Sequence, residues 1–127
     1  MTRQQLINYC LTFADAVESY PFESIASRVW TVIRHRTSNR GFAHIYERDG
    51  NLCVNLKCDP YEADFFRQIY DGVSAAYHMN KTHWNTLYLD GNVPDEVLMK
   101  MLDQSHQLIF EGLSKKMQEE LLDCADG

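Results

Sequence analysis

Residues 41–58, "GFAHIYERDGNLCVNLKC", constrain most strongly how this chain can fold. An Asp-Gly pair lies between two stretches of alternating side-chain character. This is the strongest short-range signal for a β-hairpin, because glycine accepts the positive φ that a tight turn requires. The alternation gives the second stretch an apolar face made of Leu52, Val54 and Leu56. We therefore predict antiparallel strands over 41–47 and 51–58.

Helices are expected where apolar side chains recur every three or four residues. This pattern predicts helices over 2–17, 60–70 and 94–111, and a further short helix over 114–124. In the first of these, one apolar face is formed by Leu6, Cys10, Phe13 and Val17. Asp59 followed by Pro60 is a typical helix start, because the carboxylate caps free N–H groups and proline has no N–H to leave unpaired.

Further strands are predicted over 28–35, 74–79 and 83–90 by their β-branched and aromatic residues. A chain of 127 residues with 45% apolar composition is expected to form one domain around one core. The predicted element order is α-β-β-β-α-β-β-α. We therefore expect an α+β fold, a two-layer sandwich in which an antiparallel sheet of about five strands carries its helices on one face.

The charge of the chain is unevenly distributed. The net charge of −6 argues against a strong nucleic-acid-binding protein. Residues 28–57, however, contain six basic and two acidic side chains, a net charge of +4, whereas the rest of the chain carries −10. This pattern predicts a modest basic strip on an acidic body.

The cysteines and the first residues of the chain predict the cellular compartment. The four cysteines, at positions 10, 53, 58 and 124, form no CxxC pair, which favours reduced thiols in a cytosolic protein. No long apolar run is present, and the first residues lack the pattern of a signal peptide. We therefore expect a soluble, cytoplasmic monomer that does not contact membranes and needs no cofactor.

A short polar cluster lies within residues 76–91, "AYHMNKTHWNTLYLDG", and it contains His78, Asn80, Lys81, His83, Trp84 and Asn85. As a metal site it would use the two histidines, with or without Cys58, but their spacing of five is not that of a helical pair and no carboxylate is nearby. As a structural turn, its polar side chains would satisfy backbone groups while Trp84 fills the core.

Two other interpretations give this cluster a chemical role. Cys58 could act as a thiolate with a histidine as base, because Lys57 and the following helix start would lower the pKa of the thiol. Alternatively, Lys81 and the asparagines could contact phosphates while Trp84 or Tyr77 stacks on a base. We favour the interpretation as a phosphate-contacting surface, because so many hydrogen-bonding groups gather in one turn.

Several segments together resemble the MmcQ/YjbR family, notably "LKCDPYEADFFRQIYDGV" and "YHMNKTHWNTLYLDG". The resemblance spans residues 4–117. It implies a compact α+β domain with a fold like that of CyaY, the bacterial frataxin, and a DNA-binding role without enzyme activity. The chain departs from the family at Arg40-Gly41, where Lys-Met is common, and at Ala75-Ala76, where Pro-Gly is common. Iron binding is not carried over, because Asp15 is the only acid within residues 2–17.

The sequence therefore predicts a non-enzymatic domain that binds DNA weakly, in a salt-dependent manner, through phosphate contacts. No metal ligands are assigned. The predicted binding residues are Arg34, Arg36, Arg40, Lys57, His78, Asn80, Lys81, His83, Trp84 and Asn85. The alternatives are a small-molecule or protein-interaction module that binds an anionic ligand on the same face, and a cysteine-dependent enzyme.

Overall fold

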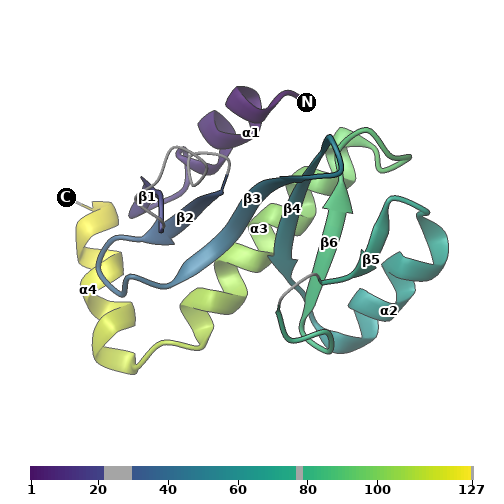
Figure 1. Ribbon diagram of the computed structural model, residues 1–127. Helices are drawn as coiled ribbons and strands as arrows, with labels where there is room; N and C mark the ends of the chain where they lie inside the picture. The colour runs from purple at the N-terminus through teal and green to yellow at the C-terminus, as the bar shows by residue number, and fades with distance from the viewer. Residues whose placement is uncertain (22–29, 77–78, 127) are drawn as a thin grey trace.

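The computed structural model describes residues 1–21, 30–76 and 79–126. Within these ranges the chain forms four helices and six strands (Figure 1). In chain order they are α1 (Arg3–Cys10), β1 (Ala16–Ser19), β2 (Thr31–His35), β3 (Gly41–Arg48), β4 (Asn51–Lys57), α2 (Pro60–Ile69), β5 (Val73–Ala75), β6 (Trp84–Tyr88), α3 (Asp95–Glu111) and α4 (Lys115–Asp126).

The six strands form one antiparallel sheet in the order β1-β2-β3-β4-β6-β5. Helix α3 crosses behind β3 and β4 (Figure 1). Leu6 and Cys10 of α1 and Ala63 of α2 belong to the same buried core as the residues of α3. The α+β fold with helices on one face is therefore confirmed. The sheet has six strands rather than about five, because residues 16–19 form an additional strand.

The Asp-Gly hairpin is present as predicted. Arg48 and Asn51 close the β3–β4 ladder, and the two residues between them both have positive φ, 52° at Asp49 and 80° at Gly50. Positive φ at both central positions is the backbone geometry that matches the twist of the flanking strands. A tight local turn therefore joins the two longest strands of the sheet.

The helix expected over 2–17 is wrong beyond its first half. α1 begins with a capping box of Thr2 and Gln5 but ends at Cys10. The chain then turns at Asp15, whose φ is 60°, and β1 pairs with β2. Asp15 is fixed by the β2–β3 connection: its carbonyl accepts the N–H of Arg36 at 2.7 Å and its carboxylate accepts that of Thr37 at 2.8 Å. These tertiary bonds override the local helical pattern.

Other predicted boundaries shift by a few residues. Within the described residues β2 starts at Thr31, and residues 28 and 29 of the predicted strand lie outside them. The strand expected over 74–79 is limited to Val73–Ala75, and that expected over 83–90 to Trp84–Tyr88. Asp59 caps α2 as expected, and the Glu62 carboxylate in the first turn of this helix accepts a hydrogen bond from Gln104 of α3.

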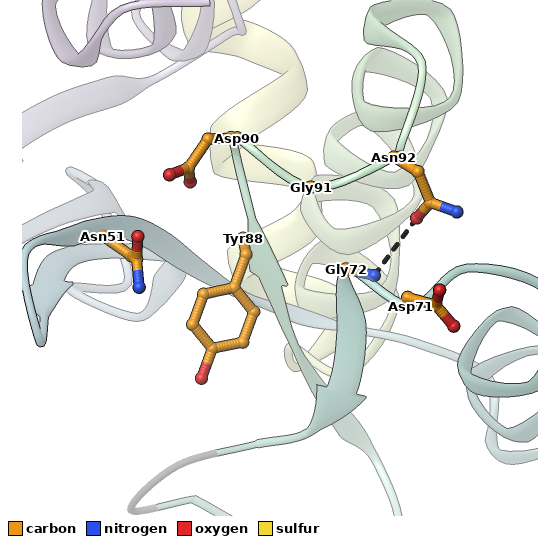
Figure 2. Close-up of a pocket in the computed structure, with 7 residues that line it drawn as sticks. All are labelled: Asn51, Asp71, Gly72, Tyr88, Asp90, Gly91 and Asn92. Atoms are coloured by element: carbon orange, nitrogen blue, oxygen red, sulfur yellow. Dashed lines mark hydrogen bonds between the residues drawn. The ribbon is translucent and has the colours of Figure 1, made fainter.

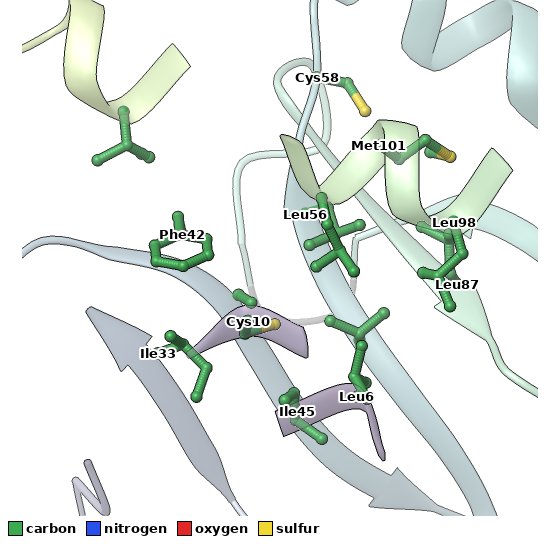
Figure 3. Packing of buried hydrophobic residues seen from close by; sticks show 14 of the residues in the cluster. Leu6, Cys10, Ile33, Phe42, Ile45, Leu56, Cys58, Leu87, Leu98 and Met101 are labelled. Carbon is green, nitrogen blue, oxygen red and sulfur yellow. The ribbon is translucent and has the colours of Figure 1, made fainter. Parts of the chain in front are cut away.

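The apolar core lies between the sheet and the helices (Figure 3). We call this side of the sheet the helix face; its buried strand residues include Ile33, Ala43, Ile45, Val54, Leu56 and Leu87. Leu6 and Cys10 of α1 and Met101 of α3 pack against it and are at most 1% exposed. Burial of this apolar surface supplies most of the free energy that holds the two layers together.

The opposite side of the sheet is the polar face, which carries Val32, Arg34, His44, Tyr46, Asn55, Lys57, Trp84 and Thr86. At its centre the Asn55 Oδ1 accepts the hydroxyls of Tyr46 at 2.8 Å and Thr86 at 2.6 Å. Trp30 stacks on Tyr46 with 4.4 Å between ring centroids. Buried polar groups on this face are therefore satisfied by one another across three strands.

Candidate functional site

The predicted basic residues come from three segments that meet at one end of the sheet. In the antiparallel order, β2 and β4 end where β3 and β6 begin. We call this the basic end; its cationic side chains are Arg34, Arg36, Arg40, Lys57 and Lys81. Because neighbouring strands lie about 4.8 Å apart, the three steps from β2 to β6 span about 15 Å.

Arg34 is held on the polar face by neutral partners. Its Nε donates to the Ser19 hydroxyl at 2.9 Å, and one terminal nitrogen donates to the Asn39 carbonyl at 3.1 Å. Neither acceptor carries a charge, so these bonds fix the guanidinium without neutralising it. None of the five cations at the basic end forms an ion pair with a carboxylate of the described residues.

His44 connects the β2 side of this end to β6. Its ring meets Trp84 edge to face, with 5.5 Å between ring centroids. Burial, with a smaller contribution from the charge of Arg34, lowers the pKa of His44 to about 4. Arg34, neutral His44 and half-buried Trp84 therefore share the polar face, and Lys57, the strand partner of Trp84, shares it too.

The turn before β6 is organised by Asn80. Its Oδ1 accepts the N–H groups of Thr82 at 2.9 Å and His83 at 3.3 Å, and its carbonyl accepts that of Trp84 at 3.0 Å. This side chain thus has the backbone-satisfying role that the structural interpretation assigns to it. Lys81 and His83 are exposed, although the Lys81 ammonium reaches the Ala76 carbonyl at 3.3 Å. His78 and Tyr77 lie outside the described residues.

Asn85 is on the helix face, away from the other predicted binding residues, and is fully buried. Its amide donates to the Ala63 carbonyl at 3.1 Å, and its Oδ1 accepts the Nε of Arg67 at 2.6 Å. Arg67 also donates to the carbonyls of Trp84, at 3.2 Å, and Lys81. Arg67, which the sequence pattern did not single out, therefore joins α2 to the turn; its only sequence signal is a basic residue in the last turn of a helix.

The setting of Cys58 does not favour a thiolate. The expectation that Lys57 and the start of α2 lower its pKa is wrong: burial, followed by the charge of Glu62, raises the pKa of the thiol to about 12. Cys58 is 1% exposed and, like Cys10 and Cys53, is not in a disulfide. Within the described ranges, no three His, Cys, Asp or Glu side chains come together to hold a metal ion.

The other end of the sheet has the opposite charge. A shallow cleft of about 580 Å³ is lined there by Asn51, Asp71, Gly72, Tyr88, Asp90, Gly91 and Asn92 (Figure 2). Its floor is a close contact of two glycines, since a Cβ on Gly91 would lie 2.8 Å from the Cα of Gly72. The carboxylates of Asp71 and Asp90 point away from one another (Figure 2). The sheet therefore has a basic and an acidic end.

The described helices include none that is both long and apolar enough to cross a membrane.

Known relatives share most of this chain. The Escherichia coli K12 protein YjbR is 32% identical over 107 residues, covering 84% of this chain and 86% of the relative. The Bacillus subtilis protein YyaQ is 23% identical over 118 residues, covering 85% and 98%.

Solved structures show the same fold. The crystal structure of the Deinococcus radiodurans protein DR2400, a DUF419 domain, superposes with a TM-score of 0.81 at 30% identity, covering 94% of this chain and 87% of that one. A Pseudomonas syringae protein gives a TM-score of 0.74 at 28% identity, covering 85% and 98%. The family model YjbR matches residues 11–108. The chain therefore belongs to the YjbR family, as its resemblance to MmcQ/YjbR sequences predicted.

Proposed function

We propose that this protein binds DNA weakly, through phosphate contacts made by the basic end of the sheet. Arg36, Arg40 and Lys81 are the exposed contacts in this proposal, with Lys57 and Arg34 beside them on the polar face. Trp84 offers an aromatic edge next to these charges. Asn85 is left out of the contact set, because its amide is already bonded inside the protein.

The observation that carries the proposal is the convergence of three basic segments at one end of an antiparallel sheet. Their cations have no carboxylate partner among the described residues, so phosphates would not have to displace an internal ion pair. The acidic cleft at the far end, with Asp71 and Asp90, repels the polyanion and favours one orientation. DNA would then meet the protein end-on.

Such binding depends on the release of counterions from DNA. With about four phosphate contacts, affinity should fall about 100-fold between 50 and 200 mM salt, because the logarithm of the binding constant falls with a slope near −0.9 per contact. The net charge of −6 opposes approach by any other surface, so we expect binding to be weak even at low salt.

The test is fluorescence anisotropy of a labelled random-sequence duplex at 50 and 200 mM salt. Lys81→Ala and the double variant Arg36→Gln/Arg40→Gln are compared with the wild-type protein. Each should weaken binding at low salt and reduce the salt slope, the double variant more strongly. No binding of the wild-type protein at low salt would overturn the proposal.

Lys115→Gln/Lys116→Gln is the matched control, because it also removes two positive charges, but from exposed positions on α4. If the basic end is the binding surface, this control retains nearly all of the affinity. Equal losses in the two double variants would show that only the net charge of the protein matters.

A small anionic ligand at the same end is the second candidate, and one observation favours it. Arg36 and Thr37 line a hollow of about 350 Å³ together with Phe13, Asp15 and Ala16. That volume lies within the usual range for small-molecule sites, and Arg36 could hold a phosphate or carboxylate. Asp15 at the wall limits how much negative charge the hollow can accept.

Titration with inorganic pyrophosphate and with a nucleoside monophosphate, followed by NMR, distinguishes the two candidates. Saturable shifts at Arg36 and Thr37 that Arg36→Gln abolishes and Lys81→Ala leaves unchanged would support the hollow. Shifts spread over all three basic segments, with no saturation, would favour the extended phosphate-contact surface.

A further inference from the structure

His35, the last residue of β2, is buried on the helix face, where no other described residue gives it a hydrogen bond. It is 1% exposed, and neither ring nitrogen is bonded to any described residue. Its ring lies against Phe42, with centroids 5.4 Å apart, and against His106 of α3, at 4.4 Å. Leaving a buried polar group unpaired costs about 1–3 kcal/mol, so this arrangement calls for a physical explanation.

A cavity lies beside this ring. It measures about 130 Å³, and its walls are Ala14, His35, His106, Gln107, Phe110, Leu121 and Leu122. They come from the turn after α1, from β2, and from facing turns of α3 and α4. Leu122 is 55% exposed, which places the cavity rim at the surface.

The chemistry of the walls restricts what fits. Two polar groups of the other walls are already engaged: the His106 Nε2 pairs with the Ala14 carbonyl at 3.2 Å, and the Gln107 Nε2 donates to Glu111 at 3.1 Å. Water needs two to four polar partners to be held in a buried site, whereas an apolar cavity of about this size accommodates a benzene-sized molecule. One hydrogen-bonding group and an apolar body match these walls best.

The charge state of the site disfavours an anion. Burial, and then the positive form of His106, lower the pKa of His35, although the main chain of His106 opposes this effect. Burial also lowers the pKa of His106. Both rings are therefore neutral near pH 7, and an anion would lose its hydration without gaining a cation.

We propose that the cavity beside His35 binds a small neutral hydroxyl compound with an apolar body, for which phenol is the simplest probe. The hydroxyl donates to the unprotonated nitrogen of His35 or accepts from its N–H group. The ring packs against Phe110 and Leu121. This site opens on the helix face, whereas the proposed DNA contacts use the polar face and the exposed loop and turn residues Arg36, Arg40 and Lys81.

Binding is tested by titrating the isotope-labelled protein with phenol and, separately, with toluene, which has nearly the same shape but no hydroxyl. NMR follows the ring nitrogens of His35 and the methyl groups of Leu121 and Leu122. Phenol should give saturable shifts at these groups and bind about tenfold more tightly than toluene, the effect of one hydrogen bond made by an otherwise unpaired group. Equal affinities, or no saturable shift with millimolar phenol, would overturn the proposal.

Two variants sharpen the test. His35→Phe keeps an aromatic ring in place and removes both nitrogens, so phenol should lose its advantage over toluene while toluene still binds. Ala14→Leu adds bulk at the wall of the cavity and should weaken binding of both. If His35→Phe retained the preference for phenol, the hydroxyl would be bonded elsewhere and the proposal would fail.

His83→Phe is the matched control, since it makes the same substitution at an exposed histidine at the basic end. It should leave both affinities unchanged. Near-ultraviolet circular dichroism establishes that each variant keeps its tertiary packing. Should His35→Phe not fold, the wild-type comparison of phenol with toluene still decides the outcome.

Discussion

The two faces of the sheet bury their side chains by different means. Leu56 and Asn55 are neighbours on β4 and are both fully buried, yet Leu56 lies among carbon atoms on the helix face and Asn55 accepts two hydroxyls on the polar face. Apolar contacts are non-directional, so the helix face can adjust its packing, whereas hydrogen bonds require fixed positions. The helix face therefore supplies most of the stability and the polar face specifies strand register.

The largest predicted effect is on the helix face. Leu56→Ala should lower the free energy of unfolding by about 2–5 kcal/mol, because it removes buried methyl groups and leaves a cavity beneath α3. Urea denaturation measures this change. A loss below 1 kcal/mol would mean that the helices close over the gap easily and that this face is loosely packed.

Acid should destabilise the polar face through His44. Its pKa is about 4 in the folded protein and 6.5 as the ordinary value, so the unfolded chain binds the proton more readily between these limits. The stability that neutral His44 contributes is present above pH 6.5 and is lost as the pH falls toward 4, about 3 kcal/mol in all. His44→Phe should flatten the stability profile in this window, and His83→Phe should not. Identical slopes for the wild-type protein and His44→Phe would contradict the prediction.

A smaller loss is expected at the hydrogen-bonded centre of the polar face. Asn55→Ala removes the acceptor shared by Tyr46 and Thr86 and should cost about 1–3 kcal/mol. Asn55→Ala should also increase hydrogen exchange of the β4 and β6 amides through local opening of these strands. Leu56→Ala should increase exchange of the same amides mainly through global unfolding. Similar exchange patterns in the two variants would remove the distinction between the faces.

The smallest effect is expected at Gly50, which belongs to neither face. A Cβ there would meet nothing within 4 Å, so Gly50→Ala reports only the cost of placing a side chain at φ 80°. We expect about 1 kcal/mol by thermal unfolding. A much larger loss would indicate that the turn, rather than the polar network, sets the register of β3 and β4.

Local patterns predicted the hairpin, the capped start of α2 and the long helix α3, because each depends on neighbouring residues. β1 was missed because it depends on Asp15 bonding to residues about twenty positions away. At the site, the sequence identified the basic segments and the antiparallel order brought them to one end. The inward direction of Asn85 and the role of Arg67 could not be predicted, since both depend on where α2 packs against β6.

The lengths of the strands have a consequence for how this protein behaves in a crowded solution. The long strands, β3 with eight residues and β4 with seven, lie inside the sheet. Its edge strands are short: β1 has four residues and β5 has three. Pro21, which has no N–H, follows β1 closely. Short edge strands offer few unpaired amides on which another chain could add a strand. Within the described residues, the sheet therefore offers few positions at which edge-to-edge aggregation could start.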